Sequence, residues 1–141
     1  MDPRDFLALA KDLRKRGDAA ALRTAISRAY YYAFVLSRKY VGKYHPIPSS
    51  VDAHKFLPEL LQNSGNDDLR DVGKHLDDLR RDRNEADYDV DVDRPEKTKH
   101  VDYCLKMAEQ IVLDLVAVMG DHVAWNKAVA EMARWKSLVG K

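Results

Sequence analysis

Hydrophobic residues in the segment 19–41 cover far more than one stripe of a helix. When the segment is projected at about 100° per residue, these residues spread over roughly two thirds of the circumference. They are Leu22, Ala25, Ile26, Ala29, Tyr30, Ala33, Phe34, Leu36, Tyr40 and Val41. A helix that is apolar on so many sides needs neighbours on each of them, so the segment predicts a central helix around which the chain packs. Arg28 is predicted to lie partly in apolar surroundings, because Tyr31 and Tyr32 follow it by one helical turn.

Five further segments place hydrophobic residues at helical spacing. Turn-forming residues separate them, among them Gly17, the run 44–50 with its two prolines, and the run 63–66. Pro58 is predicted near the first turn of the third helix, and Pro95 is predicted to open the fifth. The predicted helices are residues 4–16, 54–62, 67–87 and 95–119, and a last helix that begins after Asp121. The predicted N-caps are Asp18, Asn66 or Asp67, and Asp121.

Together these segments predict an all-α fold, an up-and-down helical bundle of five to six helices. A chain of 141 residues fits one domain that can bury a core, so residues 1–141 are predicted to form a single domain. Residues 121–141 are predicted to add a C-terminal extension helix with one apolar stripe. The stripe consists of Trp125, Ala128, Met132, Trp135 and Val139.

One charged residue interrupts the apolar seam of the predicted helix 67–87. The seam consists of Leu69, Val72, Leu76, Leu79 and Ala86. Arg83 occupies the position that the seam skips, and an unpaired buried charge is costly. Arg83 must therefore pair with an acid or face a polar cleft or a second chain. In the last case the helix forms a homodimer interface in which two copies of Arg83 face one groove. We also predict an ion pair between Arg28 and Asp87, which lies one turn beyond Arg83.

The charge balance limits the classes of binding partner that are compatible with the sequence. The chain has 24 basic and 23 acidic residues, so its net charge of +1 argues against a surface that is basic all over. A local basic site is compatible with this balance. No apolar run approaches the roughly 18 residues that span a membrane, and the N-terminus lacks a signal-peptide core. We expect a cytoplasmic protein without a membrane partner.

We predict no metal site and no cofactor. His45 and His54, or a histidine with the acidic loop 89–93, offer metal ligands, but no such pair stands four residues apart on one helix face. The lone Cys104 rules out an internal disulfide and, without a partner cysteine, a Cys-rich zinc site. No Gly-rich phosphate loop is present, nor is a nucleophile with a base motif.

Two segments carry a resemblance to a known family. They are AISRAYYYAF at 25–34 and LRRDRNEADY at 79–88. Together they resemble the HEPN family of higher eukaryotes and prokaryotes, and the match extends over residues 5–118 with the helices in the same order. The resemblance implies a small helical bundle, usually a homodimer. It also implies a metal-independent ribonuclease, a toxin of a toxin–antitoxin or antiphage defence system, or a nucleotide-binding module.

The catalytic members of that family carry an arginine, a polar residue directly after it, and a histidine four to six residues further along. Arg83 and Asn84 match the first two positions. Tyr88 and residues 89 and 90 occupy the histidine spacings, so the histidine is absent. Metal-free RNA cleavage needs a group that takes up the 2′-hydroxyl proton near neutral pH. Tyrosine is a poor substitute, and the sequence therefore favours phosphate binding by Arg83 over catalysis.

Three hypotheses follow. In the first, the protein is a HEPN-like dimer that binds RNA or a nucleotide at a cleft with Arg83, Asn84 and Tyr88, flanked by Arg28 and Asp87, and works with a cognate antitoxin or a nucleotidyltransferase-like protein. In the second, it is a ribonuclease in which Tyr88, or a histidine from elsewhere in the fold, replaces the missing base. In the third, it is a structural or interaction module whose two arginines only pair with Asp87.

Overall fold

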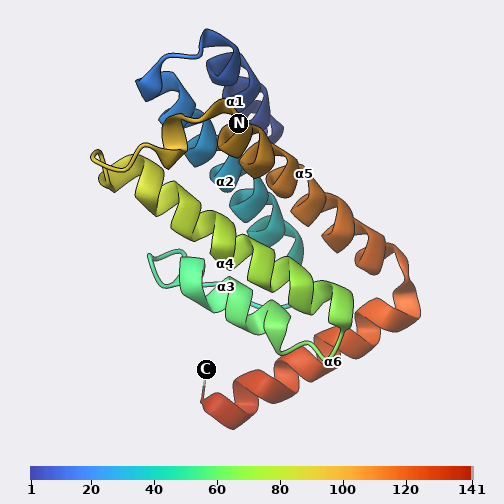
Figure 1. The fold of residues 1–141 in the computed structure, drawn as a ribbon. Coiled ribbons are helices and arrows are strands. Elements are labelled where there is room, and N and C mark those ends of the chain that lie inside the picture. The colour runs from blue at the N-terminus through green and yellow to red at the C-terminus, as the bar shows by residue number, and fades with distance from the viewer. Residues whose placement is uncertain (141) are drawn as a thin grey trace.

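A computed structural model describes residues 1–140, which form six α-helices and no strand (Figure 1). This confirms the predicted all-α helical bundle. Lys141, the last residue of the predicted extension helix, lies outside the described residues. The elements are α1 (Arg4–Arg16), α2 (Ala19–Val41), α3 (Ala53–Gln62), α4 (Asp67–Tyr88), the 3₁₀ turn η1 (Arg94–Glu96), α5 (Thr98–Gly120) and α6 (His122–Val139).

Helix α2 runs through the middle of the bundle and packs against α1, α4 and α5 (Figure 1). Its side chains are buried on several sides: Ile26 and Tyr30 are fully buried, and Phe34 is nearly so. The prediction of a central helix is confirmed with the same bounds, 19–41. The rest of the fold is arranged so that every apolar side of α2 meets another helix.

Polar side chains begin three of the helices as predicted. The Asp18 carboxylate accepts the Ala21 N–H at 3.3 Å, and the Asn66 side chain accepts the Leu69 N–H at 3.0 Å. The Asp121 carboxylate accepts the Ala124 N–H at 3.1 Å. Each cap satisfies a donor that the first turn of a helix leaves unpaired.

The prediction that Pro95 opens the long fifth helix is wrong. Pro95 lies in η1, Lys97 is extended with ψ of 122°, and α5 begins only at Thr98. The reason is a tertiary contact, because Arg23 on α2 binds the Glu96 carboxylate through Nε at 2.9 Å and Nη2 at 2.7 Å. This contact holds the η1 turn against α2.

The position predicted for Pro58 is also wrong, since this proline lies inside α3 and not in its first turn. The α3 helix crosses α4 at close range around Gly73. A Cβ atom at Gly73 would lie only 2.7 Å from the Pro58 carbonyl oxygen. Glycine at this position is therefore what lets the two helices approach each other.

Helix α6 crosses the end of the bundle, near the lower ends of α4 and α5 (Figure 1). Trp125, Ala128 and Met132 are buried, as the predicted stripe requires. The stripe does not extend to its last member, because Trp135 is only half-buried and Val139 is 47% exposed. The extension helix thus packs on the bundle mainly through its first half.

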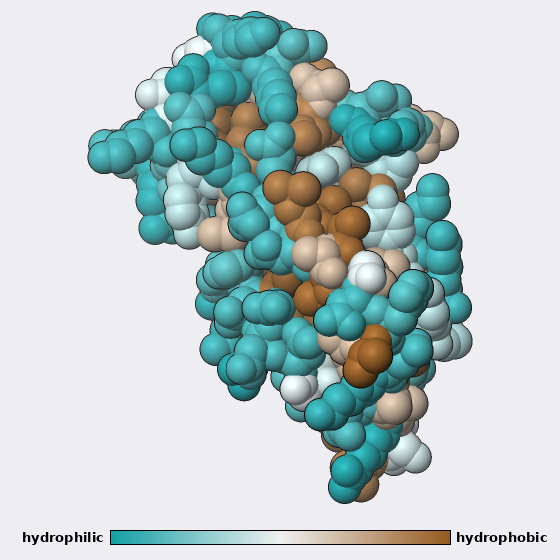
Figure 2. Space-filling model, turned by 90° about the vertical axis from the view of Figure 1, so that its right-hand side faces the viewer, coloured by the Kyte–Doolittle hydropathy of each residue, from teal (hydrophilic) through white to brown (hydrophobic). Residues whose placement is uncertain are grey.

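The outer side of the molecule at α5 carries apolar side chains. Leu113 and Val116 on α5 are exposed, and Figure 2 shows hydrophobic side chains gathered in a band on this side. The exposed positions of α4 are mostly charged, among them Arg70, Asp78 and Arg81. Within the described part of the chain, no helix combines the length and the apolar character needed to cross a membrane.

Candidate functional site

Arg83 lies on the apolar side of α4, as the seam predicts, with only 11% of its side chain exposed. Its guanidinium carbon stands 5.1 Å from the ring centre of Tyr30 and 5.6 Å from that of Tyr31. Both tyrosines belong to α2. Aromatic faces attract cations, so these rings offset part of the hydration free energy that Arg83 loses on burial.

The guanidinium of Arg83 is short of partners. Its one charged contact among the described residues is with Asp87, where Nη1 lies 3.9 Å from Oδ2. That separation is too long for a hydrogen bond. The Nε atom is buried and has no partner within the described structure. A guanidinium has five N–H donors, so Arg83 keeps donors available in apolar surroundings.

Arg28 lies beside Arg83 and shares the Tyr31 ring, whose centre is 4.8 Å from the Arg28 guanidinium carbon. It also stands 5.5 Å from the ring of Phe6 on α1. Its Nε is buried without a partner among the described residues. Two guanidinium groups therefore stand near one aromatic ring, which concentrates positive charge at this place.

The predicted direct ion pair between Arg28 and Asp87 is wrong. Arg28 Nη2 donates to the Ser27 hydroxyl at 3.2 Å, and that hydroxyl donates to Asp87 Oδ2 at 3.2 Å. The serine stands between the two charges because the Arg28 guanidinium is drawn toward Phe6 and Tyr31. Asp87 thus accepts a hydrogen bond from the Ser27 hydroxyl and lies 3.9 Å from Arg83. Its charge is not paired at hydrogen-bond distance with Arg28 or with Arg83.

His54 on α3 completes the cluster, and sequence reasoning considered it only as a metal ligand. Its Nδ1 atom lies 2.6 Å from the Tyr30 hydroxyl, in a hydrogen bond whose direction follows the imidazole tautomer. Its ring stacks on Phe34 with 4.0 Å between ring centres. Burial, followed by the charge of Arg83, lowers the pKa of His54, and burial raises the pKa of Tyr30. His54 is therefore a neutral imidazole near neutral pH.

Tyr88 and Asn84 are not joined to this cluster. Tyr88 is 72% exposed, and no hydrogen bond or ring contact in the described structure links it to Arg83. Five residues along a helix correspond to a rotation of about 140°, which turns Tyr88 away from the Arg83 side. Asn84 is half-buried one position further around α4. Their predicted roles gain no contact from the fold and stay predictions.

The Arg83 cluster thus draws on four helices: α1 supplies Phe6, which lies against Arg28, α2 supplies Arg28 and Tyr31, α3 supplies His54, and α4 supplies Arg83. No family model, curated protein or solved structure matches this chain. The HEPN resemblance therefore rests on the two sequence segments that carry it.

Arg23, which sequence reasoning missed, fixes the end of α4. Only 12% of its side chain is exposed, and it binds the Glu96 carboxylate. It also donates to the carbonyl oxygens of Ala86 at 3.1 Å and Asp89 at 3.2 Å, and to that of Val92. A cation on the last carbonyls of a helix satisfies them and suits the helix dipole. Arg23 thereby holds the turn of α4 that carries Asp87.

A hollow of about 410 Å³ lies elsewhere, between the loop before α3, α3 itself and α6. Its lining consists of Pro46, Pro48, Asp52, Lys55, Phe56, Glu59 and Lys136. The hollow shares no residue with the Arg83 cluster, and its described lining contains no histidine, cysteine or arginine. We therefore assign the site by the chemistry of Arg83 and not by this hollow.

A second group of side chains lies between α4 and α5. Asp82, His100 and Cys104 place one possible metal-binding atom each within 4.8 Å of the others. His100 and Cys104 stand four residues apart on α5, a pair that the sequence analysis did not consider. The expectation of no metal site therefore overlooked the one place where the described residues gather three such ligands.

Proposed function

We propose that this protein binds a phosphate group of RNA or of a nucleotide at Arg83 and Arg28. The observation that carries the proposal is the buried Arg83 guanidinium, for which the described residues provide a single charged contact at 3.9 Å and no partner for Nε. The planar fork of arginine matches phosphate and gains two parallel hydrogen bonds from it. A phosphate supplies the acceptors that the described residues do not.

The aromatic residues support the same ligand class. Tyr31 and Phe6 are half-buried beside the two guanidinium groups. Single-stranded RNA and nucleotides stack their bases on aromatic rings while arginines hold their phosphates. The proposed setting, taken from the HEPN resemblance, is a toxin–antitoxin or antiphage defence system. The proposed partner there is a cognate antitoxin or a nucleotidyltransferase-like protein.

The experiment is a fluorescence titration with a labelled single-stranded RNA and, separately, with a nucleoside triphosphate. We expect Arg83→Ala to weaken binding of at least one probe by tenfold or more, in line with the loss of charged hydrogen bonds worth about 1.5 kcal/mol or more. Arg83→Lys should restore only part of it, because lysine lacks the fork. Equal binding by wild type and Arg83→Ala would remove the proposal.

Arg81→Ala is the matched control. Arg81 lies two residues from Arg83 on α4, and 69% of its side chain is exposed beside Asp77 and Asp78. Removing it changes the net charge by the same amount as removing Arg83. If both variants lose affinity equally, the binding is nonspecific attraction to positive charge and not a site at Arg83.

The homodimer is part of the proposal. The proposed two-fold interface is formed by the exposed face of α4, whose residues are mostly charged, so the interface would be polar. Light scattering at micromolar concentration tests it against the chain mass of 16.1 kDa. We expect twice this mass, and a clean 16.1 kDa species would contradict a dimeric site.

A second candidate function is metal-independent RNA cleavage with His54 as the base. The observation that favours it is a neutral imidazole whose pKa is lowered by burial and by Arg83, within the same cluster. When Nδ1–H donates to Tyr30, the Nε2 atom is left free to take up a 2′-hydroxyl proton.

The assay is cleavage of labelled RNA in the presence of a chelator. We expect His54→Gln to abolish any cleavage and Tyr88→Phe, which removes only an exposed hydroxyl, to leave it unchanged. Loss of cleavage in Tyr88→Phe would indicate that Tyr88, and not His54, is the base. Cleavage that appears only in Tyr88→His would mean that the natural protein binds RNA without cutting it.

A further inference from the structure

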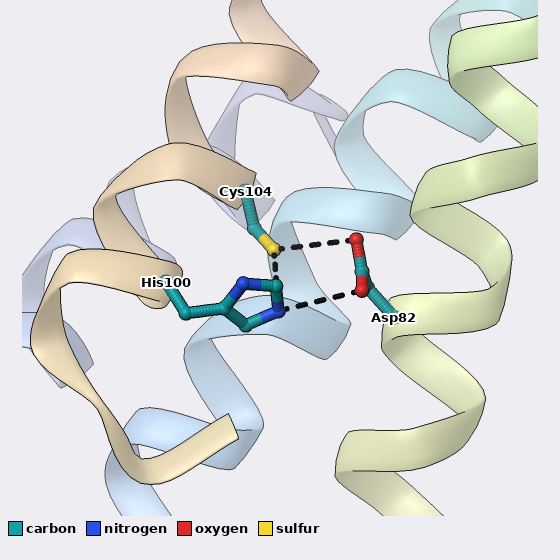
Figure 3. A group of neighbouring side chains, drawn as sticks. All are labelled: Asp82, His100 and Cys104. Carbon is teal, nitrogen blue, oxygen red and sulfur yellow. Dashed lines mark hydrogen bonds and ion pairs between the residues drawn. The ribbon is translucent and has the colours of Figure 1, made fainter. Parts of the chain in front are cut away.

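Asp82, His100 and Cys104 point toward one another across the space between α4 and α5 (Figure 3). His100 Nε2 lies 3.3 Å from Asp82 Oδ1, Cys104 Sγ lies 3.6 Å from His100 Nε2, and Sγ lies 3.7 Å from Asp82 Oδ2. Cys104 is fully buried, and the side chains of Asp82 and His100 are each 17% exposed. Three different donor atoms therefore converge on one partly enclosed point.

The arrangement is not that of a catalytic triad. In a triad the histidine uses its two ring nitrogens for two partners, one for the nucleophile and the other for the carboxylate. Here the same Nε2 atom faces both the sulfur and the carboxylate. The histidine cannot relay a proton between groups that share one of its nitrogens, and the buried sulfur does not meet the surface.

The nitrogen-to-oxygen separation exceeds that of a good charged hydrogen bond, whereas the two sulfur distances are those of weak hydrogen bonds of the thiol. A charged imidazole and a carboxylate normally approach to about 2.7–2.9 Å, whereas Nε2 and Oδ1 stay 3.3 Å apart. A tetrahedral zinc ion bonded at about 2.3 Å to sulfur and about 2.0 Å to nitrogen and oxygen sets its ligands about 3.3 Å (nitrogen to oxygen) and about 3.5 Å (sulfur to either) apart. The observed values of 3.3, 3.6 and 3.7 Å lie close to these edges.

The surroundings suit a cation. The Asp82 carboxylate and the Cys104 sulfur lie 3.7 Å apart in a mostly buried setting, where a positive ion between them would be favourable. The Arg94 guanidinium, which is close enough to influence both groups, is held by Glu85 through two bonds of 2.8 and 2.7 Å. Its charge is thereby balanced, so that it does not repel a metal ion as a free guanidinium would.

We propose that Asp82, His100 and Cys104 bind one Zn²⁺ ion, with water in the fourth position. Sulfur, imidazole and carboxylate together form a ligand set of intermediate softness, which zinc accepts. On binding, the thiol proton of Cys104 leaves to solvent and the thiolate bonds to the metal. The ion links the last turns of α4 to the first turns of α5 across the acidic loop 89–93. Asp82 directly precedes Arg83 in the sequence, but the site shares no residue with the Arg83 cluster and does not depend on the function proposed there.

The test is a titration of the chelator-treated protein with Co²⁺, a spectroscopic stand-in for zinc. We expect sulfur-to-cobalt charge-transfer absorption, strong visible bands of tetrahedral cobalt, a stoichiometry of one ion per chain, and loss of these bands when Zn²⁺ is added. Zn²⁺ should also raise the melting temperature of the metal-free protein. A wild-type protein that shows neither the sulfur band nor a higher melting temperature would overturn the proposal.

Variants identify the ligands. Cys104→Ala should abolish the sulfur band and the rise in melting temperature, whereas His122→Ala, which removes an exposed histidine on α6, should change neither. If Cys104→Ala loses its helical circular dichroism and is therefore unfolded, the ligands are tested with Asp82→Asn and His100→Ala instead. Each should bind cobalt at least about tenfold more weakly than wild type. Unchanged affinity in these two variants, or a folded Cys104→Ala that keeps the full thermal shift, would place the metal elsewhere.

Discussion

Arg23 and Arg83 are equally buried, with 12% and 11% of their side chains exposed, yet their surroundings differ completely. Arg23 binds a carboxylate twice and several backbone carbonyls at the end of α4. Arg83 lies against two aromatic rings, and the nearest oxygen of Asp87 is 3.9 Å from it. Its Nε atom has no hydrogen-bond partner among the described residues. One arginine is fully used by the fold, and the other is not.

The difference separates a structural arginine from a candidate functional one. Removing a fully paired buried charge leaves its partners unsatisfied and is strongly destabilising, whereas a poorly paired buried charge is itself a cost that an apolar side chain avoids. Burial alone therefore does not distinguish the two roles. What distinguishes them is how many of the five guanidinium donors the protein itself satisfies.

The largest expected effect is that of Arg23→Met. The substitution keeps much of the side-chain volume but leaves Glu96 and the carbonyls of Ala86 and Asp89 without their donor. We expect a loss of about 3 kcal/mol in the free energy of unfolding. Urea denaturation measures this loss, with Arg16→Met as control, since Arg16 is 67% exposed and its one ion pair among residues 1–140 is with Asp18. A loss no greater than in the control would show that the Arg23 contacts contribute little.

Substitution of the acids beside the two arginines should lower the stability to different degrees. Glu96→Gln removes the charge that Arg23 binds and should cost about 1.5 kcal/mol. Asp87→Asn keeps an acceptor for Ser27 and should cost about 0.5 kcal/mol, because Asp87 is 29% exposed and 3.9 Å from Arg83. It should also strengthen RNA binding by removing a competing anion. Weaker RNA binding by Asp87→Asn would mean that Asp87 positions Arg83 for its ligand.

A smaller effect is expected from pH. Because the folded-state pKa of His54 is lowered, the unfolded chain binds more protons than the folded one as the pH falls through about 6.5. The contribution of neutral His54 to stability is present above that pH and is lost below it. We expect His54→Phe to lose less stability than wild type between about pH 7.5 and pH 5.5. Arg83→Met should reduce the same difference, and identical pH profiles for wild type and His54→Phe would contradict the burial of this imidazole.

The sequence predicted what depends on local pattern. The bounds of α1 and α2, the caps at Asp18 and Asn66, and the place of Arg83 on the apolar side of α4 all follow from helical periodicity. Such features need only the spacing of residues along one element. These features can therefore be predicted without knowledge of any tertiary contact.

The contacts between elements were not predictable in this way. His54 meets Tyr30 only because α3 packs on the bundle, and Asp82 meets the α5 ligands only because α4 and α5 lie side by side. The spacing of His100 and Cys104 was visible in the sequence, but a pair four residues apart is common and needs a third ligand to become specific. Arg23 could not be distinguished from a solvated arginine until its acceptors were placed around it.

The stability of Arg83→Met decides whether the fold depends on Arg83. The substitution is the same as the one at Arg23, so the two unfolding curves can be compared in one denaturant without a ligand. We predict that Arg83→Met changes the free energy of unfolding by less than about 1 kcal/mol, or raises it, while losing RNA or nucleotide binding. A loss of about 3 kcal/mol, equal to that expected for Arg23→Met, would show that Arg83 is a structural arginine that the fold needs.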